Sequence, residues 1–517
     1  MAWFSEPDSS TPRAAKHAER PVTLHNTMGN ADEPFASARP GAPVRMYHCG
    51  PTVYGPAHIG NLRSYVFADI LRRTLEYNGF SVKQVINITD VGHLSSDADE
   101  GEDKMTKGLK REGLAVSLEN MRLLAGRYEE RFKQDLATLD IETAGTQFPR
   151  ASEHIAPMIA MIQTLEQKGY TYKTSDGIYY DTSRFPEYGK LGGIDVAALK
   201  EGARIEANVE KKNPADFALW KFDDALGFES PFGKGFPGWH IECSAMSRVA
   251  LGEQLDIHTG GIDHIPVHHN NEIAQSEAAT GKKPFARIWM HNAFITIDDE
   301  KIAKSLGNAI DLDELPKHGI HPLALRYYYL GAHYRTPVNF SWAALKSAQQ
   351  ALLRLHFLFD QMPVNAAAEP IMAYQQRFHE RINADLDTPG ALAIAWELVK
   401  DTSFPAPAIR ATLLDFDTVL GLSLGAPDAQ LARLIIAEFG EIVPAEKLSK
   451  TVADLITARE EARGAKDWTK ADALRAQVLQ LGYALEDTPA GPRVLRKEIV
   501  EQEEREADTE SDPEGSL

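Results

Sequence analysis

Two cysteines, a pair of adjacent histidines and a glutamate could together hold a metal ion. Cys49 and Cys243 are the two cysteines of the chain, and the segment HHNNE places His268, His269 and Glu272 close together. If this segment is helical, Glu272 shares a helix face with either histidine, because residues three and four apart are neighbours. Thiolate, imidazole and carboxylate groups are the usual ligands of tetrahedral zinc. The residues are thus a plausible set of zinc ligands, and cysteines that are small buried hydrophobic residues are the alternative. The spacing does not choose between the two histidines.

A second group of candidate residues lies in the segment PTVYGPAHIGN, residues 51–61. It joins a predicted strand to a predicted helix, so free main-chain N–H groups and the positive end of the helix dipole would face a bound phosphate. His58 stands just before the helix, and Gly60 leaves room for a flat base. The segment favours a nucleotide site, and an ordinary glycine-containing helix start is the alternative.

Two lysines occur in the segment KIAKSLGN, residues 301–308, which follows a strand-like run at residues 293–297. Lys301 and Lys304 could neutralise triphosphate oxygens while charge develops on a leaving pyrophosphate. A solvated pair of loop lysines is the alternative interpretation.

A parallel sheet would bring these groups together. Hydrophobic patterns predict strands at residues 22–27, 43–49 and 82–88 and a helix over residues 58–79. A strand, helix and strand in this order predict a βαβ unit, in which ligands bind beyond the carboxyl ends of the strands. A further strand at residues 255–259, a tight turn at Gly260 and Gly261, and a helix at residues 271–279 would follow.

The remaining segments predict an insertion and a helical end. Between about residues 115 and 235, helical and irregular segments alternate, which we interpret as an insertion between two half-sheets. From residue 343 onward helical patterns dominate, at residues 343–359, 374–385, 389–400, 406–420 and 452–481.

Length and composition set outer limits on the function. For a chain of 517 residues with 43% hydrophobic and 25% charged residues, we expect a multidomain globular protein and expect neither a membrane span nor a secretory signal. Two widely separated cysteines argue against a disulfide framework. The net charge is −19, of which residues 498–517 carry −8 and the rest −11. Any contact with RNA must therefore use local basic stripes and shape.

These elements, in this order, resemble one family, the cysteinyl-tRNA synthetases of the class I aminoacyl-tRNA synthetases. HIGN at residues 58–61 is similar to the family's HIGH signature, and KIAKS at residues 301–305 to its KMSKS signature. PGWHIECSAM at residues 237–246 and HHNNE at residues 268–272 resemble its zinc segments. Further similar segments are residues 331–335, 385–389, 466–472 and 482–483. The resemblance extends from about residue 22 to about residue 497.

The resemblance implies an enzyme that activates L-cysteine with ATP to cysteinyl-adenylate and transfers the cysteinyl group to the 3′ end of tRNA(Cys). It assigns one zinc ion per chain to Cys49, Cys243, His268 and Glu272, which chooses the first histidine. The zinc ion would read the substrate thiol, and Mg²⁺ would accompany ATP.

Further residues receive roles from the same resemblance. His58, Lys301 and Lys304 would stabilise developing charge, and no covalent enzyme intermediate is needed. Trp239 would line the amino-acid pocket, with Thr52 near it. The implied ATP site comprises His58, Gly60, Asn61, Gly260, Gly261, Asp263 and Lys304.

Three positions depart from the family signatures. Asn61 replaces the second histidine of HIGH, which keeps a hydrogen-bond donor but removes a group that can carry positive charge. Ala303 replaces the first serine of KMSKS, and Ile302 replaces methionine with a residue of similar size. We interpret these changes as differences that tune the rate.

The predicted fold is α/β: a Rossmann-type parallel-sheet catalytic domain with an inserted connective domain, followed by an α-helical bundle that forms an anticodon-binding region. The expected boundaries are a mobile extension at residues 1–20, a catalytic domain at 21–345, a helical bundle at 346–425, a small anticodon-side module at 426–497 and an acidic disordered tail at 498–517. We expect a cytoplasmic monomer with tRNA(Cys), ATP and L-cysteine as partners and no membrane contact.

Two other functions remain as alternatives. A ligase that joins cysteine to an amino sugar would share the zinc site and the adenylation chemistry but would lack a full anticodon-binding end. A catalytically silent tRNA-binding relative is the second alternative, which Asn61 and Ala303 leave open.

Overall fold

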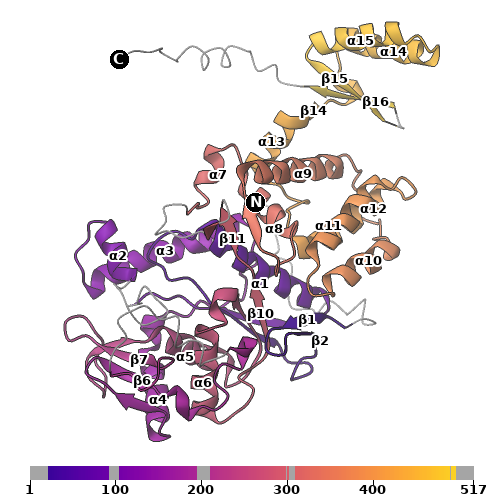
Figure 1. Ribbon diagram of the computed structural model, residues 1–517. Coiled ribbons are helices and arrows are strands. Elements are labelled where there is room, and N and C mark those ends of the chain that lie inside the picture. Colours follow the sequence, from indigo (N-terminus) through magenta and orange to yellow (C-terminus); the bar gives the residue numbers. More distant parts are fainter. Residues whose placement is uncertain are drawn as a thin grey trace, which may run out of the picture. The chain divides into compact units, whose positions relative to one another are not determined.

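The chain divides into two compact units in the computed structural model (Figure 1). One comprises Met1–Gln349 and Met362–Leu424, and the other comprises Gln350–Gln361 and Gly425–Leu517. The structure describes residues 21–91, 104–194, 210–297, 300–301, 309–488 and 491–496. The predicted extension at residues 1–20, residues 302–305 of the predicted lysine loop and the predicted acidic tail lie outside these ranges.

A four-stranded sheet in the order β10-β9-β3-β4 forms the centre of the first unit. Its strands are β3 (Val44–His48), β4 (Val82–Ile86), β9 (Leu255–Gly261) and β10 (Ala286–Asn292). Neighbouring strands are parallel. Strand β3 lies between β9 and β4, with its Tyr47 opposite His258 of β9 and Val85 of β4. The carboxyl ends of the four strands therefore lie at one edge, and the predicted α/β fold with a βαβ unit is confirmed.

Helix α1 (Ile59–Tyr77) connects β3 to β4 and has clear signals at both ends. His58 is its N-cap, and the helix stops at Asn78, after which Gly79 adopts a φ of +83°. Its apolar residues at helical spacing, Leu62, Val66, Ile70, Leu71 and Leu75, are all buried. These residues agree with the helix that the sequence predicts.

The insertion contains a second sheet that the sequence analysis missed. Its strands, in the order β5-β6-β7-β8, are antiparallel: β5 (Thr171–Lys173), β6 (Gly177–Tyr180), β7 (Phe217–Phe222) and β8 (Gly235–Pro237). The expectation of helical and irregular segments alone was wrong, because strands of three to six residues are too short to show alternation clearly. The helices of this region are α2 (Lys104–Arg111), α3 (Leu118–Thr138) and α4 (Ile155–Gln167).

Two helices beside this sheet carry the candidate ligands other than Cys49. They are α5 (Trp239–Leu251) and α6 (His268–Thr280), which lie together with α4, β6 and β7 (Figure 1). The predicted tight turn at Gly260 and Gly261 was wrong, because both residues continue β9, opposite His291 and Asn292 of β10. The chain turns after them, at Ile262–His264.

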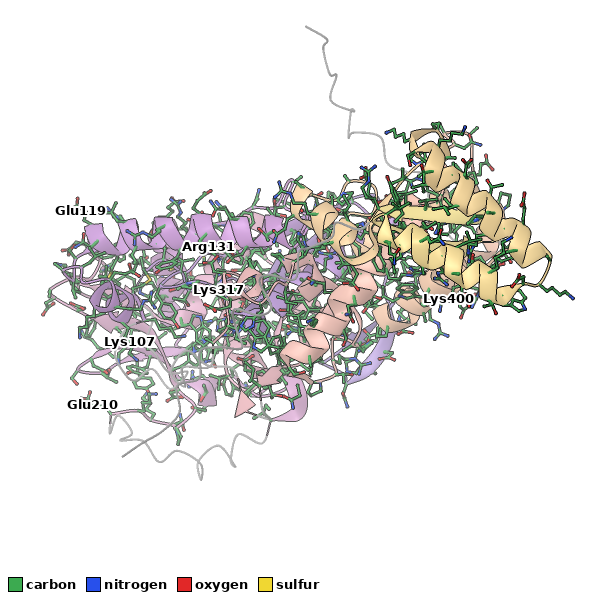
Figure 2. All side chains as sticks on the ribbon, turned by 90° about the horizontal axis from the view of Figure 1, so that it is seen from above. Lys107, Glu119, Arg131, Glu210, Lys317 and Lys400 are labelled. Atoms are coloured by element: carbon green, nitrogen blue, oxygen red, sulfur yellow. The ribbon has the colours of Figure 1, made fainter. Side chains whose placement is uncertain are left out.

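A small sheet follows, in the order β12-β11-β13. Its strands are β11 (Ile295–Ile297), β12 (Glu300–Lys301) and β13 (Val338–Phe340), and the helices between β12 and β13 are α7 (Glu314–Lys317) and α8 (Pro322–Leu330). Arg131 of α3 donates to both carboxylate oxygens of Asp313, at 2.7 and 2.8 Å. Figure 2 shows Arg131 and, on α7, Lys317 in this region. The pair joins α3 to the segment that precedes α7.

The first four of the five helices expected from residue 343 onward are present. They are α9 (Trp342–Asp360), α10 (Met372–Ile382), α11 (Thr388–Lys400) and α12 (Ala406–Leu420). Helix α10 ends three residues before the expected end, because Asp385 and Leu386 have positive φ angles of 52° and 59°. At the other end of the unit, the hairpin β1 (Thr23–Asn26) and β2 (Ala31–Pro34) pairs in antiparallel register.

The second unit combines helices with a small sheet. Its elements besides the end of α9 are α13 (Ala429–Phe439), β14 (Glu441–Ile442), α14 (Lys450–Gly464), α15 (Trp468–Gln480), β15 (Tyr483–Thr488) and β16 (Gly491–Arg496). The single helical pattern expected over residues 452–481 is two helices, because Lys466 adopts a φ of +60° and Asp467 caps a new helix. Across the described ranges, we find no helix with the length and apolar character needed to cross a membrane.

Candidate functional site

Four side chains with metal-binding atoms meet at the carboxyl edge of the parallel sheet. Cys49 directly follows β3, and His268, His269 and Glu272 lie at the start of α6. Their ligand atoms all lie within 4.8 Å of one another, and all four residues are buried. The structure thus brings together residues that are more than 200 positions apart in the sequence.

Both histidines lie within reach of a shared metal ion. His268 Nε2 is 3.0 Å from Glu272 Oε1, and His269 Nε2 is 3.9 Å from the same oxygen. Cys49 Sγ lies 3.3 Å from His269 Nε2 and 3.9 Å from Glu272 Oε1. The distances leave both histidines near the common centre of the site.

Cys243 joins this site from α5. It is 1% exposed and lies outside the group of four mutually close residues, but the side chains of Cys49 and His268 are near enough to affect its pKa. The hydrogen bond from the Cys49 thiol outweighs burial and lowers the pKa of Cys243 to about 6, with further help from His268. Cys243 is therefore the cysteine that favours the thiolate, the form that binds metals.

The charges of the site match a bound cation. Burial disfavours the carboxylate of Glu272, but His258 and His268 outweigh it and lower the pKa of Glu272 to about 2. Burial also opposes charge on His268, but Glu272 and Cys243 hold the pKa of His268 at about 10. A metal ion would replace the second imidazole proton of His268 and would be bound by sulfur, nitrogen and oxygen donors in a buried site. The residues therefore fit zinc.

Gly50 holds the position of Cys49 because the chain passes very close to β4. A Cβ atom at Gly50 would lie 1.5 Å from the carbonyl oxygen of Asn87. The Gly50 N–H donates to Asn87 Oδ1 at 2.8 Å, and the same oxygen lies 3.7 Å from Cys243 Sγ. Asn87 thereby links the residue after one cysteine to the other.

Further histidines surround the ligands, and the sequence analysis missed them. His258 Nε2 lies 3.0 Å from Glu272 Oε2. His269 Nδ1 lies 2.7 Å from His291 Nε2, whose other ring nitrogen lies 2.8 Å from Thr27 Oγ1. The signal that could have found them is that six of the chain's 17 histidines fall between residues 240 and 291.

Trp239 lies beside these ligands at the start of α5 and is half-buried. Its ring centroid is 4.3 Å from that of His268. The Nζ atom of Lys104 lies over the same tryptophan ring, 5.5 Å from its centroid. Thr52 forms an isolated bridge with Thr89, whose hydroxyl donates to Glu242, the residue before Cys243, at 2.8 Å. Both predicted pocket residues are thus in or near the segments that carry the ligands.

Some of the predicted nucleotide-binding residues lie near the same edge of the sheet. His58 caps α1, and Asn61 forms a reciprocal capping box with it. A Cβ atom at Gly260 would lie 2.6 Å from His264 Nδ1 and 2.8 Å from His269 Cε1, so this glycine is needed for the histidines to pack. Gly261 ends β9, and Asp263 lies in the turn after it. The main chain of Lys301 lies in β12, and Lys304 is outside the described residues.

Sequence families match both ends of the chain. Residues 36–350 match the family described as tRNA synthetases class I (C) catalytic domain. Residues 445–492 match the family described as cysteinyl-tRNA ligase anticodon binding domain.

Similar proteins cover nearly the whole chain. Cysteine–tRNA ligase 1 of Burkholderia lata is 46% identical over 481 residues, which are 92% of this chain and 97% of that protein. The cysteine–tRNA ligase of Treponema denticola is 41% identical, over 92% of this chain and 99% of its own length. A solved methionyl-tRNA synthetase of Mycobacterium tuberculosis shares the fold, with a TM-score of 0.50 at 14% identity over 78% of this chain and 95% of that one. The chain belongs to the cysteine–tRNA ligase family of class I aminoacyl-tRNA synthetases.

Proposed function

We propose that this chain activates L-cysteine with ATP to cysteinyl-adenylate and then transfers the cysteinyl group to the 3′ end of tRNA(Cys). The observation that carries the proposal is the buried group of Cys49, His268, His269 and Glu272, with Cys243 beside it, at the carboxyl edge of a parallel sheet. That edge is where ligands bind in this class of fold. The names of the similar proteins agree with this function.

The zinc ligands in this proposal are Cys49, Cys243, His268 and Glu272. Zinc would supply a soft Lewis acid that prefers the sulfur of cysteine to the oxygen of serine. Trp239, whose ring lies against His268, would contact the amino acid from the side of α5, and Thr52 would lie close to it. The metal site would then bind the substrate in addition to joining β3 to α5 and α6.

The adenylation step depends on groups that surround the nucleotide. His58 at the start of α1 would contact ATP together with Gly60 and Asn61, at the positive end of the helix dipole. Gly260, Gly261 and Asp263 would lie against the adenosine, and Mg²⁺ would accompany the phosphates. Lys301 and Lys304 would stabilise the charge on the leaving pyrophosphate.

The C-terminal part of the chain would contact tRNA(Cys). The boundaries that we propose are a catalytic domain at residues 21–345, a helical bundle at 346–425 and an anticodon-side module at 426–497. The match of residues 445–492 to an anticodon-binding family supports this assignment. The same match argues against a ligase that joins cysteine to an amino sugar. We propose that the protein acts as a monomer in the cytoplasm.

Two assays test the proposed function. Cysteine-dependent ATP–pyrophosphate exchange reports adenylation, and charging of a tRNA(Cys) transcript reports transfer. Exchange without charging would favour the amino-sugar ligase. If neither exchange nor charging occurred but the protein still bound tRNA, a catalytically silent tRNA-binding protein would be favoured.

A further inference from the structure

Arg63 is a buried cation on α1 whose guanidinium donates to main-chain carbonyl groups. The residue is 2% exposed. Nη1 donates to the carbonyl oxygens of Ala293 and Phe294, at 3.1 and 3.0 Å. Nη2 donates to those of His333 and Thr336, at 3.2 and 2.7 Å. A buried guanidinium is costly unless its donors are satisfied, so Arg63 favours the one backbone arrangement that offers these carbonyls.

The four carbonyls lie in the two segments that precede a pair of neighbouring strands. Phe294 directly precedes β11, and Thr336 lies two residues before β13. The two strands run parallel with Ile295 opposite Val338, and the Val338 N–H donates to the Phe294 carbonyl at 3.1 Å. Arg63 therefore holds the same end of both strands against α1.

Strand β11 is also the partner of the strand that carries Lys301. β12 pairs with β11 in antiparallel register, with Lys301 opposite Thr296. The main chain at Lys301 thus lies opposite a residue that is two positions from the Phe294 carbonyl. A shift of β11 relative to α1 would carry β12 with it.

Helix α1 also binds the chain beyond residues 302–308. The N–H of Ile59 donates to the carbonyl oxygen of Ile310 at 2.8 Å. Ile59 directly follows His58, and the hydroxyl of Tyr329 donates to the Ile59 carbonyl at 2.6 Å. The first two turns of α1 therefore contact the main chain on both sides of the predicted lysine loop, and His58 lies at the start of these contacts.

We infer that Arg63 is a positioning residue for adenylation, which holds the strand pair leading to Lys301 in a fixed place relative to His58. This inference rests on the proposed function, in which those two residues act on the phosphates of ATP. A lysine could not substitute, because its ammonium places three donors at one point, whereas the guanidinium fork reaches carbonyls of two segments. Misplacement of a reacting group by about 1 Å can cost about 100-fold in rate.

The test separates the two chemical steps in Arg63→Lys and Arg63→Gln. Single-turnover adenylate formation is measured by rapid quench, and transfer is measured from enzyme loaded with cysteinyl-adenylate. We expect adenylation to slow by about 100-fold. Transfer and the KM for cysteine should stay within about threefold of the parent, because the pyrophosphate has left before transfer and the metal site is untouched.

Arg326→Lys is the matched control. Arg326 is fully buried, donates to the main-chain carbonyls of Leu139 and Leu420, and pairs with Asp69 further along α1. Among the described residues, its hydrogen bonds reach neither β11 nor β13. We expect Arg326→Lys to lower the melting temperature at least as much as Arg63→Lys and, below that temperature, to keep adenylation within about threefold of the parent.

Each other result overturns the inference. A parent enzyme without cysteine-dependent exchange would refute the proposed function and, with it, the role of Arg63. If the parent is active and the folded Arg63 variants form adenylate at rates within about threefold of the parent, the positioning role of Arg63 is refuted and the proposed function stands. Equal slowing of both steps, or failure of both Arg63 variants to fold by circular dichroism, would make Arg63 a residue of general stability.

Discussion

The Nδ1 atom of His58 accepts the main-chain N–H of Asn61 at 3.1 Å. In return, Asn61 Oδ1 accepts the main-chain N–H of His58 at 3.3 Å. Because Nδ1 accepts, a neutral imidazole in this arrangement carries its proton on Nε2, and that nitrogen is the one able to donate to a phosphate. The main-chain N–H of Asn61 therefore orients the imidazole of His58, and the side chain of Asn61, which departs from the family's HIGH signature, holds the main chain of His58.

The first prediction is that Asn61→Ala slows adenylation by about fivefold, because it removes a capping interaction worth about 1 kcal/mol that holds the main chain of His58. Asn61→Gln is the control, since glutamine at this position of a helix also forms a capping box. Pyrophosphate exchange at saturating cysteine is the measurement. Equal activity of both variants and the parent would show that the capping box has no role in catalysis.

The second prediction concerns the ion pair between Asp69 and Arg326, whose closest atoms lie 2.6 Å apart with neither side chain exposed. Asp69 also accepts from Arg73 and from the N–H of Glu142. Asp69→Asn keeps the shape but leaves two cations without their common anion, so we expect a loss of about 3 to 5 kcal/mol in the free energy of unfolding. Urea denaturation checks this value.

A matched variant keeps that test specific. Asp313→Asn removes one anion from an ion pair with Arg131 in which Asp313 is mostly exposed. Exposed pairs contribute about 0 to 1 kcal/mol, so this variant should unfold close to the parent. A loss of similar size in both variants would mean that burial of the Asp69 pair does not set its contribution.

Helical periodicity made the first βαβ unit and four C-terminal helices predictable from the sequence. The spacing of Leu62, Val66 and Ile70 on α1 requires only local information. The strands β5 and β8 have three residues each and contain no complete alternation, so their pairing depends on contacts that sequence spacing does not reveal. The failure to predict these short strands was accordingly the main error of the sequence analysis.

The candidate site shows the same limit. His268 and Glu272 were found because both lie on one helix, whereas His258 and His291 reach the site from two separate strands. Arg63 stands on a helix where a cation normally faces solvent, and only the structure shows that it is buried under the starts of two strands. Such roles depend on tertiary contacts between distant segments.

The third prediction separates the two adjacent histidines. His268→Ala should lose bound zinc, because the proposal makes His268 a ligand, whereas His269→Ala should retain about one zinc per chain. His269 has another structural role, since its Nδ1 lies 2.7 Å from His291 Nε2. Metal content by mass spectrometry after gel filtration is the measurement. Loss of zinc in His269→Ala with retention in His268→Ala would exchange their roles.

The fourth prediction is that the metal site distinguishes cysteine from serine. The two amino acids have nearly the same shape, and a pocket that only fits the side chain discriminates by about 1 to 3 kcal/mol. A zinc ion with an accessible position binds a thiolate strongly, whereas a serine hydroxyl ionises far less readily and is a poorer ligand. The parent should therefore show exchange with cysteine and almost none with serine.

Cys243→Ser tests whether the metal provides this selectivity. Cys243 is the cysteine whose thiolate is favoured in the structure, so its loss should remove zinc and lower kcat/KM for cysteine by at least about 100-fold, toward the value for serine. Ser247→Ala, on the same helix, is the control: Ser247 is buried and its hydroxyl donates to the Ser244 carbonyl at 3.2 Å. It should retain zinc and selectivity. If Cys243→Ser folded without zinc and still activated cysteine as efficiently as the parent, the metal would be a structural link between β3, α5 and α6, and the discrimination against serine would have to come from the pocket around Trp239.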